Sequence, residues 1–551
     1  VYDYPGFNIN SNSKTIKGVI FLNASNTSQI ISYNNELRAE IPELIPSSGN
    51  TINNATVTNS IVINSVIENA NVDNGVIVNS IVYAAQSSAE EQVNKYVNDG
   101  WNTACGPWAS KFIIRTGSFL NPGDKVLFRR GDILQNDQGN RLRKTGTIEK
   151  PIYFGAYGTG AKPIINGTSA GHTFFINNYG QPMIGLVFDG LHLIGSETVG
   201  IMGFRIEGDS AHDNDPAHYA ANGYCDHITI QNMEIENFDV GIQSGASYLT
   251  VTDNIIHHNM GQGMLGGGAH VLIARNKVYS NGHKCSRTPR VHCHNLYVGH
   301  EDVQILDNEI YDGDNYGIVM HGFQNNILIR GNDIYNNWNG IATDHYNSDG
   351  LLTNILIEKN KIHNNLNGWT LSIGAVQNYT FRNNLVYNNP NGFFEIRNDD
   401  PGIKPNDGVY IYGNTFYNLS SLFNGGAPTS NAAALNNIIV CTSGSSCLGN
   451  AYNLLTNTSG NAFLSLSSAG SYFVNPGAGD FHLKSSAVNA IDKGTDLNIL
   501  QQYGADISAG FKDYDEITRP QGSGWDVGAY EYVSGTPQGT CVLTGARWEI
   551  V

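Results

Sequence analysis

The segment "ILIRGNDIYNNWNGIATDHYN" (residues 327–347) has a pattern that recurs on either side of it. Its core is apolar-x-x-Asn-x-apolar, and successive copies are 22, 32, 24, 28, 24 and 30 residues apart. One repeat upstream, Met233 stands in the Asn position. The Asn positions of the copies are Asn254, Asn276, Asn308, Asn332, Asn360, Asn384 and Asn414.

A minimum repeat of about 22 residues without a 3.6-residue periodicity is typical of strands, not helices. Each copy predicts three short strands, which form one coil of a parallel β-helix. Alternate residues then point inward and stack on the equivalent residue of the next coil, roughly 4.8 Å away. We expect the Asn amides to continue a hydrogen-bonded ladder at a corner and to tolerate left-handed backbone angles. The predicted fold class is all-β, a right-handed parallel β-helix.

Five segments follow from changes in the pattern. An Asn recurs every five residues from Asn54 to Asn79, which suits a pentapeptide-like or intertwined β-stalk whose apolar positions are shared between subunits. The final region resembles the β-rich caps that cover the last coil of β-helix proteins. We predict an attachment or leader segment at 1–50, a neck at 51–85, the β-helix at 86–450, a cap at 451–535 and a tail at 536–551.

Composition limits the possible partners. The formal net charge is −17 and only 14% of the 551 residues are charged, which disfavours nucleic acid and anionic membranes as ligands. No apolar run long enough to span a membrane occurs, and the start "VYDYPGFNIN" lacks the features of a signal peptide. The spacings of Cys285/Cys293 and Cys441/Cys447 permit loop disulfides, with free thiols as the alternative.

Residues beyond the minimum repeat must form loops, and these are expected to wall one face of the β-helix. The loops are 207–226, 282–294, 345–353 and 397–407. If the second residue of each strand on this face points inward, the third and fifth point outward, whereas Glu395 is turned inward. The predicted groove floor is Gln243, Leu265, Tyr297, Val319, His321, Ala342, Asp344, Thr370, Ser372 and Phe394.

Glycoside hydrolysis needs two carboxyl groups, and Asp344 is the first candidate because it lies on the predicted floor. Glu301 is the first choice for the second carboxylate, with the loop acids as further choices. His321 and His345 are expected beside Asp344, where an imidazole can tune a pKa or orient a water. The loop acids also leave a Ca²⁺ site open as an alternative to the expected absence of any cofactor or metal. They are Asp209, Asp213 and Asp215.

A second chemistry is encoded in "HCHNLYVGHED", which places His294, Tyr297 and His300 around one strand. A His/Tyr pair can remove the proton next to a uronate carboxyl and protonate the leaving oxygen, as in a lyase. Arg397 is then expected to neutralise the uronate. Trp338 and Tyr346 are candidate platforms on which sugar rings stack.

The repeats, together with "PGDKVLFRRGD" (122–132) and "KPIYFGAYGTGAKPIING" (150–167), resemble right-handed, pectate-lyase-like β-helix polysaccharidases over residues 100–450. With the neck and the walled face, the chain resembles a bacteriophage tailspike. That resemblance implies a homotrimer of the virion, attached to the phage tail, which binds and hydrolyses a bacterial surface polysaccharide such as O-antigen or capsule.

Two other functions stay open. One is a secreted lyase or epimerase that acts on polymers of uronic acids. The other is an adhesin that binds a glycan without cleaving it.

Overall fold

The computed structural model describes most of the repeat region and the region after it. In residues 9–83 and 115–116 it describes strand backbones alone. The described residues are 9–21, 51–63, 66–68, 71–73, 76–78, 81–83, 115–116, 120–135, 139–167, 169, 171–177, 182–207, 225–284, 293–320, 324–343, 352–366, 371–390, 394–396, 405–426, 429–442, 447–449, 452, 455–505, 507 and 511–534. The chain forms two compact units, Val1–Ile327 and Leu328–Val551.

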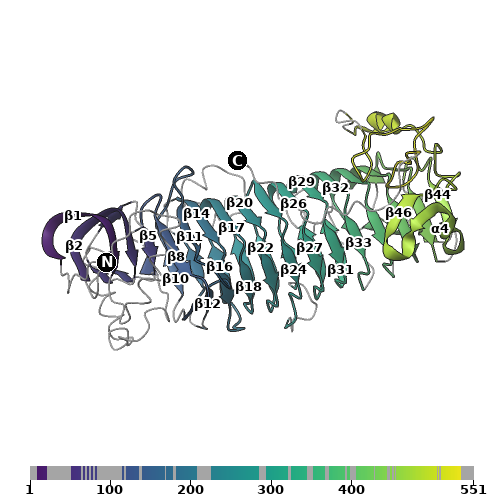
Figure 1. The fold of residues 1–551 in the computed structure, drawn as a ribbon. Helices are drawn as coiled ribbons and strands as arrows, with labels where there is room; N and C mark the ends of the chain where they lie inside the picture. The colour runs from purple at the N-terminus through teal and green to yellow at the C-terminus, as the bar shows by residue number, and fades with distance from the viewer. Residues whose placement is uncertain are drawn as a thin grey trace. The chain divides into compact units, whose positions relative to one another are not determined.

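The main part of the first unit is a stack of coils with three parallel sheets (Figure 1). Sheet 1 contains β8 (Lys125–Arg129), β11 (Ile152–Tyr157), β14 (Met183–Asp189), β17 (Cys225–Gln231), β20 (Ser247–Thr252), β23 (Val271–Ala274) and β26 (Glu301–Leu306). Sheet 2 contains β7 (Arg115–Thr116), β10 (Asn140–Leu142), β13 (Phe174–Ile176), β16 (Met202–Ile206), β19 (Val240–Ser244), β22 (Gln262–Gly266), β25 (Leu296–Tyr297) and β28 (Tyr316–Met320). Sheet 3 contains β9 (Ile133–Gln135), β12 (Ile164–Asn166), β15 (His192–Ile194), β18 (Glu234–Glu236), β21 (Ile255–His257), β24 (Lys277–Tyr279) and β27 (Glu309–Tyr311).

The second unit continues the same three-sheet plan within itself. Its sheet 1 contains β32 (Leu352–Glu358), β35 (Val376–Arg382), β38 (Asn406–Tyr412), β41 (Thr429–Ser430) and β42 (Ala433–Leu435). Its sheet 2 contains β31 (Asn339–Thr343), β34 (Leu371–Ile373), β37 (Phe394–Ile396) and β40 (Phe423–Gly425). Its sheet 3 contains β30 (Asp333–Tyr335), β33 (Lys361–His363), β36 (Leu385–Tyr387), β39 (Thr415–Leu419), β43 (Ile438–Cys441) and β44 (Ala462–Ser465). The boundary between the units falls within β29 (Gln324–Arg330).

The N-terminal strands follow a different period. They are β1 (Ile9–Phe21), β2 (Thr51–Ile63), β3 (Val66–Glu68), β4 (Asn71–Asp73), β5 (Val76–Val78) and β6 (Ile81–Tyr83). Thr51 pairs with Val66, and Val66 pairs with Ile81, so equivalent residues are 15 positions apart. The five-residue pattern therefore forms coils with three short sides inside one chain.

A small region follows the last coils of the second unit. It contains α4 (Leu466–Tyr472), an antiparallel pair of β45 (Phe473–Asn475) and β46 (Asp480–Leu483), and the 3₁₀ helices η5 (Pro476–Ala478) and η6 (Leu497–Tyr503). Phe473 and Phe481 are fully buried and share one hydrophobic cluster with Ile438 and Val440 of β43. This region therefore covers the end of sheet 3 in the second unit.

The asparagines of the repeat form the expected ladder. In the first unit, Asn254 donates both its backbone N–H (3.0 Å) and its Nδ2 (2.9 Å) to Oδ1 of Asn276, which repeats both bonds to Asn308. The same Nδ2 of Asn254 also donates to the carbonyl of Ile230. In the second unit each ladder asparagine bonds to the next one in the same way. These residues are Asn332, Asn360, Asn384, Asn414, Asn437 and Asn461.

A second ladder lies at another corner, five residues further along each coil. Asn259 donates its backbone N–H and Nδ2 to Oδ1 of Asn281, and Asn281 donates its Nδ2 to Asn295. In the second unit, Asn337, Asn365 and Asn389 form the equivalent ladder. Coils that carry both asparagines are thus linked to the next coil by amides at two corners.

The left-handed backbone angles are not at the ladder asparagines, contrary to the expectation. They belong to the residue just before each one, for example Asp253 (φ 59°), Arg275 (φ 55°) and Lys359 (φ 56°). The preceding residue turns the chain, and the Asn that follows has its side chain buried at the corner. Gly or Asn fills this position in several coils, for example Gly331, Asn336 and Asn383.

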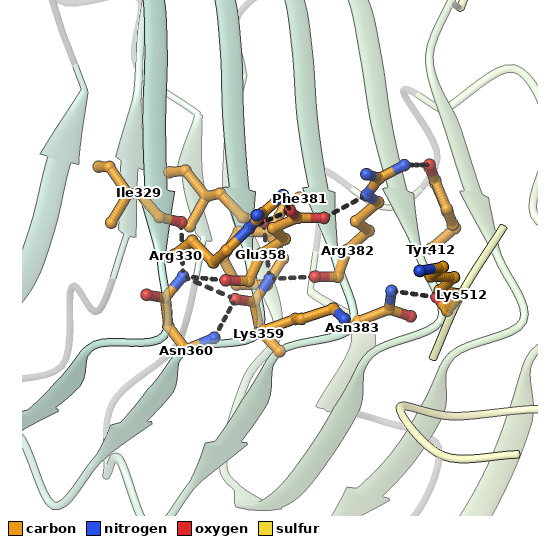
Figure 2. A network of polar contacts seen from close by, with 12 residues as sticks. Ile329, Arg330, Glu358, Lys359, Asn360, Phe381, Arg382, Asn383, Tyr412 and Lys512 are labelled. Carbon is orange, nitrogen blue, oxygen red and sulfur yellow. Dashed lines mark hydrogen bonds and ion pairs between the residues drawn. The ribbon is translucent and has the colours of Figure 1, made fainter. Parts of the chain in front are cut away.

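A charged network joins four strands of sheet 1, with all its residues in the second unit (Figure 2). The side chain of Glu358 is 1% exposed and forms an ion pair with Arg330. Its other oxygen accepts from Nε of Arg382 (2.7 Å), and Nη1 of Arg382 donates to the hydroxyl of Tyr412 (3.0 Å). Lys359 pairs with Glu516, so the segment after η6 is tied to the same sheet.

One predicted disulfide is present, between Cys441 and Cys447. Cys293 is also disulfide-bonded, whereas its predicted partner Cys285 lies outside the described residues. Cys225 is a buried free thiol.

Asn384→Ala should destabilise the protein by about 3 kcal/mol, because it removes the acceptor for the Asn360 N–H and the donor for the Ile357 carbonyl, both buried. Chemical denaturation followed by circular dichroism measures the change. Gln377→Ala, an exposed position on the same coil, is the control and should stay within about 0.5 kcal/mol. Equal effects of the two variants would contradict a role for the ladder.

Glu358→Gln should cost about 3 kcal/mol in the same assay, because it leaves the largely buried Arg382 beside a neutral partner. Glu309→Gln removes an ion pair whose side chains are 44% and 40% exposed, and should change stability by less than about 1 kcal/mol. A Glu358→Gln loss no larger than the Glu309→Gln loss would show that the network adds nothing to stability.

Candidate functional site

The outward side chains of sheet 2 in the first unit form an unbroken row. Each residue of the row is paired in register with the next, so that neighbours lie on successive coils. All are half-buried except Val319, which is 1% exposed. The row is Arg141, Phe175, Arg205, Gln243, Leu265, Tyr297 and Val319.

Two arginines of this row enclose an aromatic ring. The guanidinium carbon of Arg141 is 4.7 Å from the centre of the Phe175 ring, and that of Arg205 is 5.5 Å from it. Arg205 also forms an ion pair with Glu207 at 3.1 Å. Cation–π contacts hold the guanidinium planes in place along the row, and a planar guanidinium is well suited to a carboxylate ligand.

His172 lies beside Arg205 and faces the same ring. Its Nδ1 accepts the backbone N–H of Met202 (3.1 Å), so a neutral His172 carries its proton on Nε2. That Nε2 is 3.5 Å from Nη1 of Arg205. Burial, and secondarily the charge of Arg205, lower the pKa of His172 to about 4, so the ring is neutral at pH 7. Two N–H donors therefore converge, and a single anionic oxygen can accept from both.

The sequence predicts that His294 and Tyr297 lie together, and the structure places them so. Their ring centres are 5.6 Å apart in an edge-to-face arrangement, and His294 is also 5.9 Å from Tyr316. His294 is 4% exposed, whereas Tyr297 is half-buried on the row. Tyr297 is flanked by Leu265 and Val319, which gives its phenol an apolar surrounding along the row.

His300 and Glu301 lie after this strand, at and beyond the corner. The backbone N–H of His300 donates to Oε1 of Gln324 (2.9 Å), and the imidazole is buried. Glu301 begins β26 of sheet 1 and accepts from Nδ2 of Asn325 (3.2 Å). Glu301 therefore belongs to a different sheet from Tyr297, with a polar partner of its own.

In the second unit, the outward row of sheet 2 is Ala342, Ser372, Glu395 and Asn424. The prediction that Phe394 is on the floor and Glu395 points inward is wrong. Phe394 is 0% exposed and its ring stacks on Phe423 at 5.0 Å, while Glu395 is half-buried. The prediction counts inward and outward positions from the Gly at the start of each strand, here Gly392. In this coil the inward residue is the third from that Gly and not the second, so the count is shifted by one residue.

Of the remaining predicted site residues, the structure describes only Trp338. Trp338 is 37% exposed and directly precedes β31. The other candidates lie outside the described residues. They are Asp344, His321, His345, Asp209, Asp213, Asp215, Tyr346 and Arg397.

Sequence reasoning missed Arg141, His172, Phe175 and Arg205. The coils that carry them lack the Asn motif used for alignment. A usable signal was the alternation itself, because each row residue is flanked by inward residues, as Arg205 is by Phe204 and Ile206.

Comparisons with known proteins agree with this architecture. Residues 189–350 and 294–416 match the family model of the right-handed beta helix region. The fold is a right-handed parallel β-helix, as predicted from the repeats. No curated protein matches the chain at a significant level. None of the helices in the described part of the chain has the length and apolar character of a membrane span.

Several solved structures are similar to the chain at low sequence identity. The chain is similar to the pectate lyase Pel9A (TM-score 0.37, 15% identity, covering 75% of this chain and 88% of that one). It is similar to the PL6 family alginate lyase AlyGC (0.40, 14%, 62% and 49%). It is also similar to the GH136 lacto-N-biosidase from Eubacterium ramulus (0.35, 13%, 65% and 68%).

The lowered pKa of His172 predicts a loss of stability on acidification. An unfolded histidine, with its ordinary pKa near 6.5, binds a proton that the folded site resists until about pH 4. Stability should therefore fall as the pH drops from about 6.5 towards 4. Denaturant unfolding of the wild type and His172→Gln across this range measures the difference. If the free energy of unfolding depends on pH equally in the wild type and in the variant, His172 has an ordinary pKa and the prediction is wrong.

Proposed function

We propose that the chain binds an acidic polysaccharide along the sheet 2 row of the first unit and cleaves it. The observation that carries this proposal is the convergence of His172 Nε2–H and Arg205 Nη1 beside Phe175. A sugar carboxylate supplies an anionic oxygen that accepts hydrogen bonds from both donors, and the aromatic ring offers an apolar edge to the sugar. In a chain with a net charge of −17, such a basic stretch favours an anionic ligand over a neutral one.

The row provides several positions for sugar units. Arg205 and Tyr297 are separated by two intervening residues, Gln243 and Leu265, on successive coils. At one coil spacing per step, the distance along the row is roughly 14 Å. Arg205 and His172 therefore bind a sugar unit away from the reacting bond, where binding energy orients the chain.

The pair His294 and Tyr297 is proposed to carry out β-elimination. One group removes the proton next to a uronate carboxyl and the other protonates the leaving glycosidic oxygen, which yields an unsaturated sugar end. The edge-to-face contact at 5.6 Å brings the two groups to one position of the row. No carboxylate of the described residues is paired in register with Tyr297, whose neighbours are Leu265 and Val319.

Hydrolysis is the second candidate, and the outward position of Glu395 favours it. Ala342 and Glu395 are two coils apart in the sheet 2 row of the second unit. Asp344, two positions after Ala342 in the sequence, is the other acid of this candidate. Residues two coils apart are roughly 9.6 Å from each other. Inverting enzymes hold their two carboxyl groups about 6.5–9.5 Å apart, so this candidate needs an acid within that range of Glu395.

We further propose, from the resemblance to tailspikes, that the substrate is a bacterial O-antigen or capsule. In this proposal the protein is a homotrimer of the phage virion, attached to the tail through residues 1–50. Light scattering of the full chain tests it. A monomeric mass at micromolar concentration would oppose the trimer without affecting the proposed polysaccharide site.

Cleavage is tested by incubating the full chain with acidic bacterial capsules, O-antigens and uronic-acid polymers, followed by mass spectrometry. Elimination predicts fragments with unsaturated ends, and Tyr297→Phe should slow their release by about 100-fold or more. Tyr248→Phe, an exposed position on sheet 1, should leave the rate unchanged. Fragments that each carry an added water, with Glu395→Gln inactive and Tyr297→Phe active, would establish the hydrolytic route instead.

Arg205→Ala should raise KM for an acidic polymer by about tenfold and change kcat less, because the residue lies away from the reacting bond. Arg275→Ala removes an exposed arginine of the first unit that is paired with Asp253, and serves as the control. A KM that depends equally on both arginines, or on neither, would contradict binding along this row. Bound polymer with no fragments from any substrate would indicate a glycan-binding protein.

A further inference from the structure

A second polar cluster lies on sheet 3 of the first unit, away from the row on sheet 2. Three neighbouring strands contribute to it: β15 provides His192, β18 provides Glu234 and Glu236, and β21 provides His257. His192 is paired in register with Glu234, and Glu236 with His257. The cluster therefore joins three successive coils through side chains that all point outward from one sheet.

The donor atoms of His192, Glu234 and Glu236 are spaced as metal ligands are, and His257 lies beside both glutamates. One atom each of His192, Glu234 and Glu236 lies within 4.8 Å of the others. Nε2 of His192 is 2.9 Å from Glu236 and 3.8 Å from Glu234. Nε2 of His257 is 3.5 Å from Glu234. Ligands of a tetrahedral Zn²⁺ with bonds of about 2.0–2.1 Å lie roughly 3.3 Å apart, a value these distances bracket.

The surroundings of His257 hold its ring in place. Its ring stacks on Tyr279 at 4.9 Å with a 9° tilt, and Tyr279 stacks on Tyr311 at the same distance. Its Nδ1 is 2.7 Å from Nδ1 of His258. If His258 accepts the Nδ1 proton, Nε2 presents a lone pair towards Glu234.

The charge of the cluster also favours a cation. Two carboxylates lie beside two imidazoles, and the glutamate side chains are 30% and 20% exposed. The charge of Lys162 interacts with that of Glu234 and offsets part of the negative charge of the two glutamates. Two nitrogen and two carboxylate donors suit a first-row transition metal better than Ca²⁺, which takes oxygen ligands.

We propose that His192, Glu234, Glu236 and His257 bind one divalent transition metal ion of the Zn²⁺ class, which clamps three coils of the β-helix together. The site is structural in this proposal and is independent of the polysaccharide site, which lies on another sheet.

The second unit provides a matched comparison on its own sheet 3. His363 is stacked between Tyr335 and Tyr387, at 5.1 and 4.5 Å, as His257 is stacked on Tyr279. Its Nε2 bonds to Asp333 at 2.8 Å. Among the described residues, this pair has one imidazole and one carboxylate where the proposed site has two of each. It therefore reproduces the stacked His–carboxylate contact without the set of four donors.

The test uses the full chain freed of metal with a chelator and titrated with Zn²⁺ alone by calorimetry. One tight site is expected, together with a higher thermal midpoint in excess Zn²⁺. His192→Ala and Glu236→Gln should each weaken binding by more than about 100-fold, whereas His363→Gln should leave it unchanged. If the variants fail to fold, Co²⁺ added to the wild type should give the visible absorption of a four-coordinate site.

Several results would overturn the proposal. They are absence of Zn²⁺ binding by the folded wild type, Zn²⁺ binding that survives both His192→Ala and Glu236→Gln, and a Co²⁺ spectrum typical of six oxygen ligands. Equal loss on His363→Gln would also overturn it, because that position has too few donors for the proposed site.

Discussion

The buried asparagine amide is the interaction on which the repeat depends. At these corners a residue with positive φ turns the chain. The backbone N–H and C=O groups of the corner have no partner in the sheets, and without another partner they would be buried and unpaired. The amide of the next residue provides an acceptor for one backbone N–H and a donor for one carbonyl, as Asn384 does for Asn360 and Ile357. Because each amide also bonds to its neighbour on the next coil, the corners are fixed in register.

Because the corners are fixed, the outward side chains of each sheet form regular rows across the strands. Once the register is set, an outward residue on one strand lies beside the equivalent outward residue of the next, as Phe175 lies beside Arg205. Extra residues can be inserted between strands without disturbing this order, and the spacings of 22 to 32 residues show that they are. Chemistry is therefore encoded in short strands, while the loops vary in length.

The sequence predicts the fold well because the ladder requires Asn at one place in each coil. It even identifies Met233 as the variant of that position: the sulfur of Met233 accepts the N–H of Leu191 at 3.4 Å, and its own N–H donates to Asn254. The site is less predictable, since strands of three residues leave the inward positions open to a shift of one residue, as with Phe394 and Glu395. The loop insertions mark only one of the three outward faces, so they do not point to His192 or Glu236. Alternation around the buried Ile235 nevertheless marks Glu234 and Glu236 as outward.

Met233 also marks a change in what holds the coils together. Upstream of it, the core is aromatic: the rings of Phe154 and Phe188 stack at 5.0 Å, and those of Phe174 and Phe204 at 5.2 Å. All four side chains are fully buried. Arg141, Phe175 and Arg205 lie on these coils. Their strands are therefore supported by packed aromatic rings, because the amide ladder begins only further along the chain.

This difference has a consequence for the row. Phe174 and Phe204 directly precede Phe175 and Arg205 in the chain, so the inward ring and the outward site residue share one strand of three to five residues. Aromatic packing fixes the register, because a shift of one residue in β16 would bury Arg205 and expose Phe204. The core rings of these coils therefore determine which side chains face the ligand, as the asparagines do in the coils that follow.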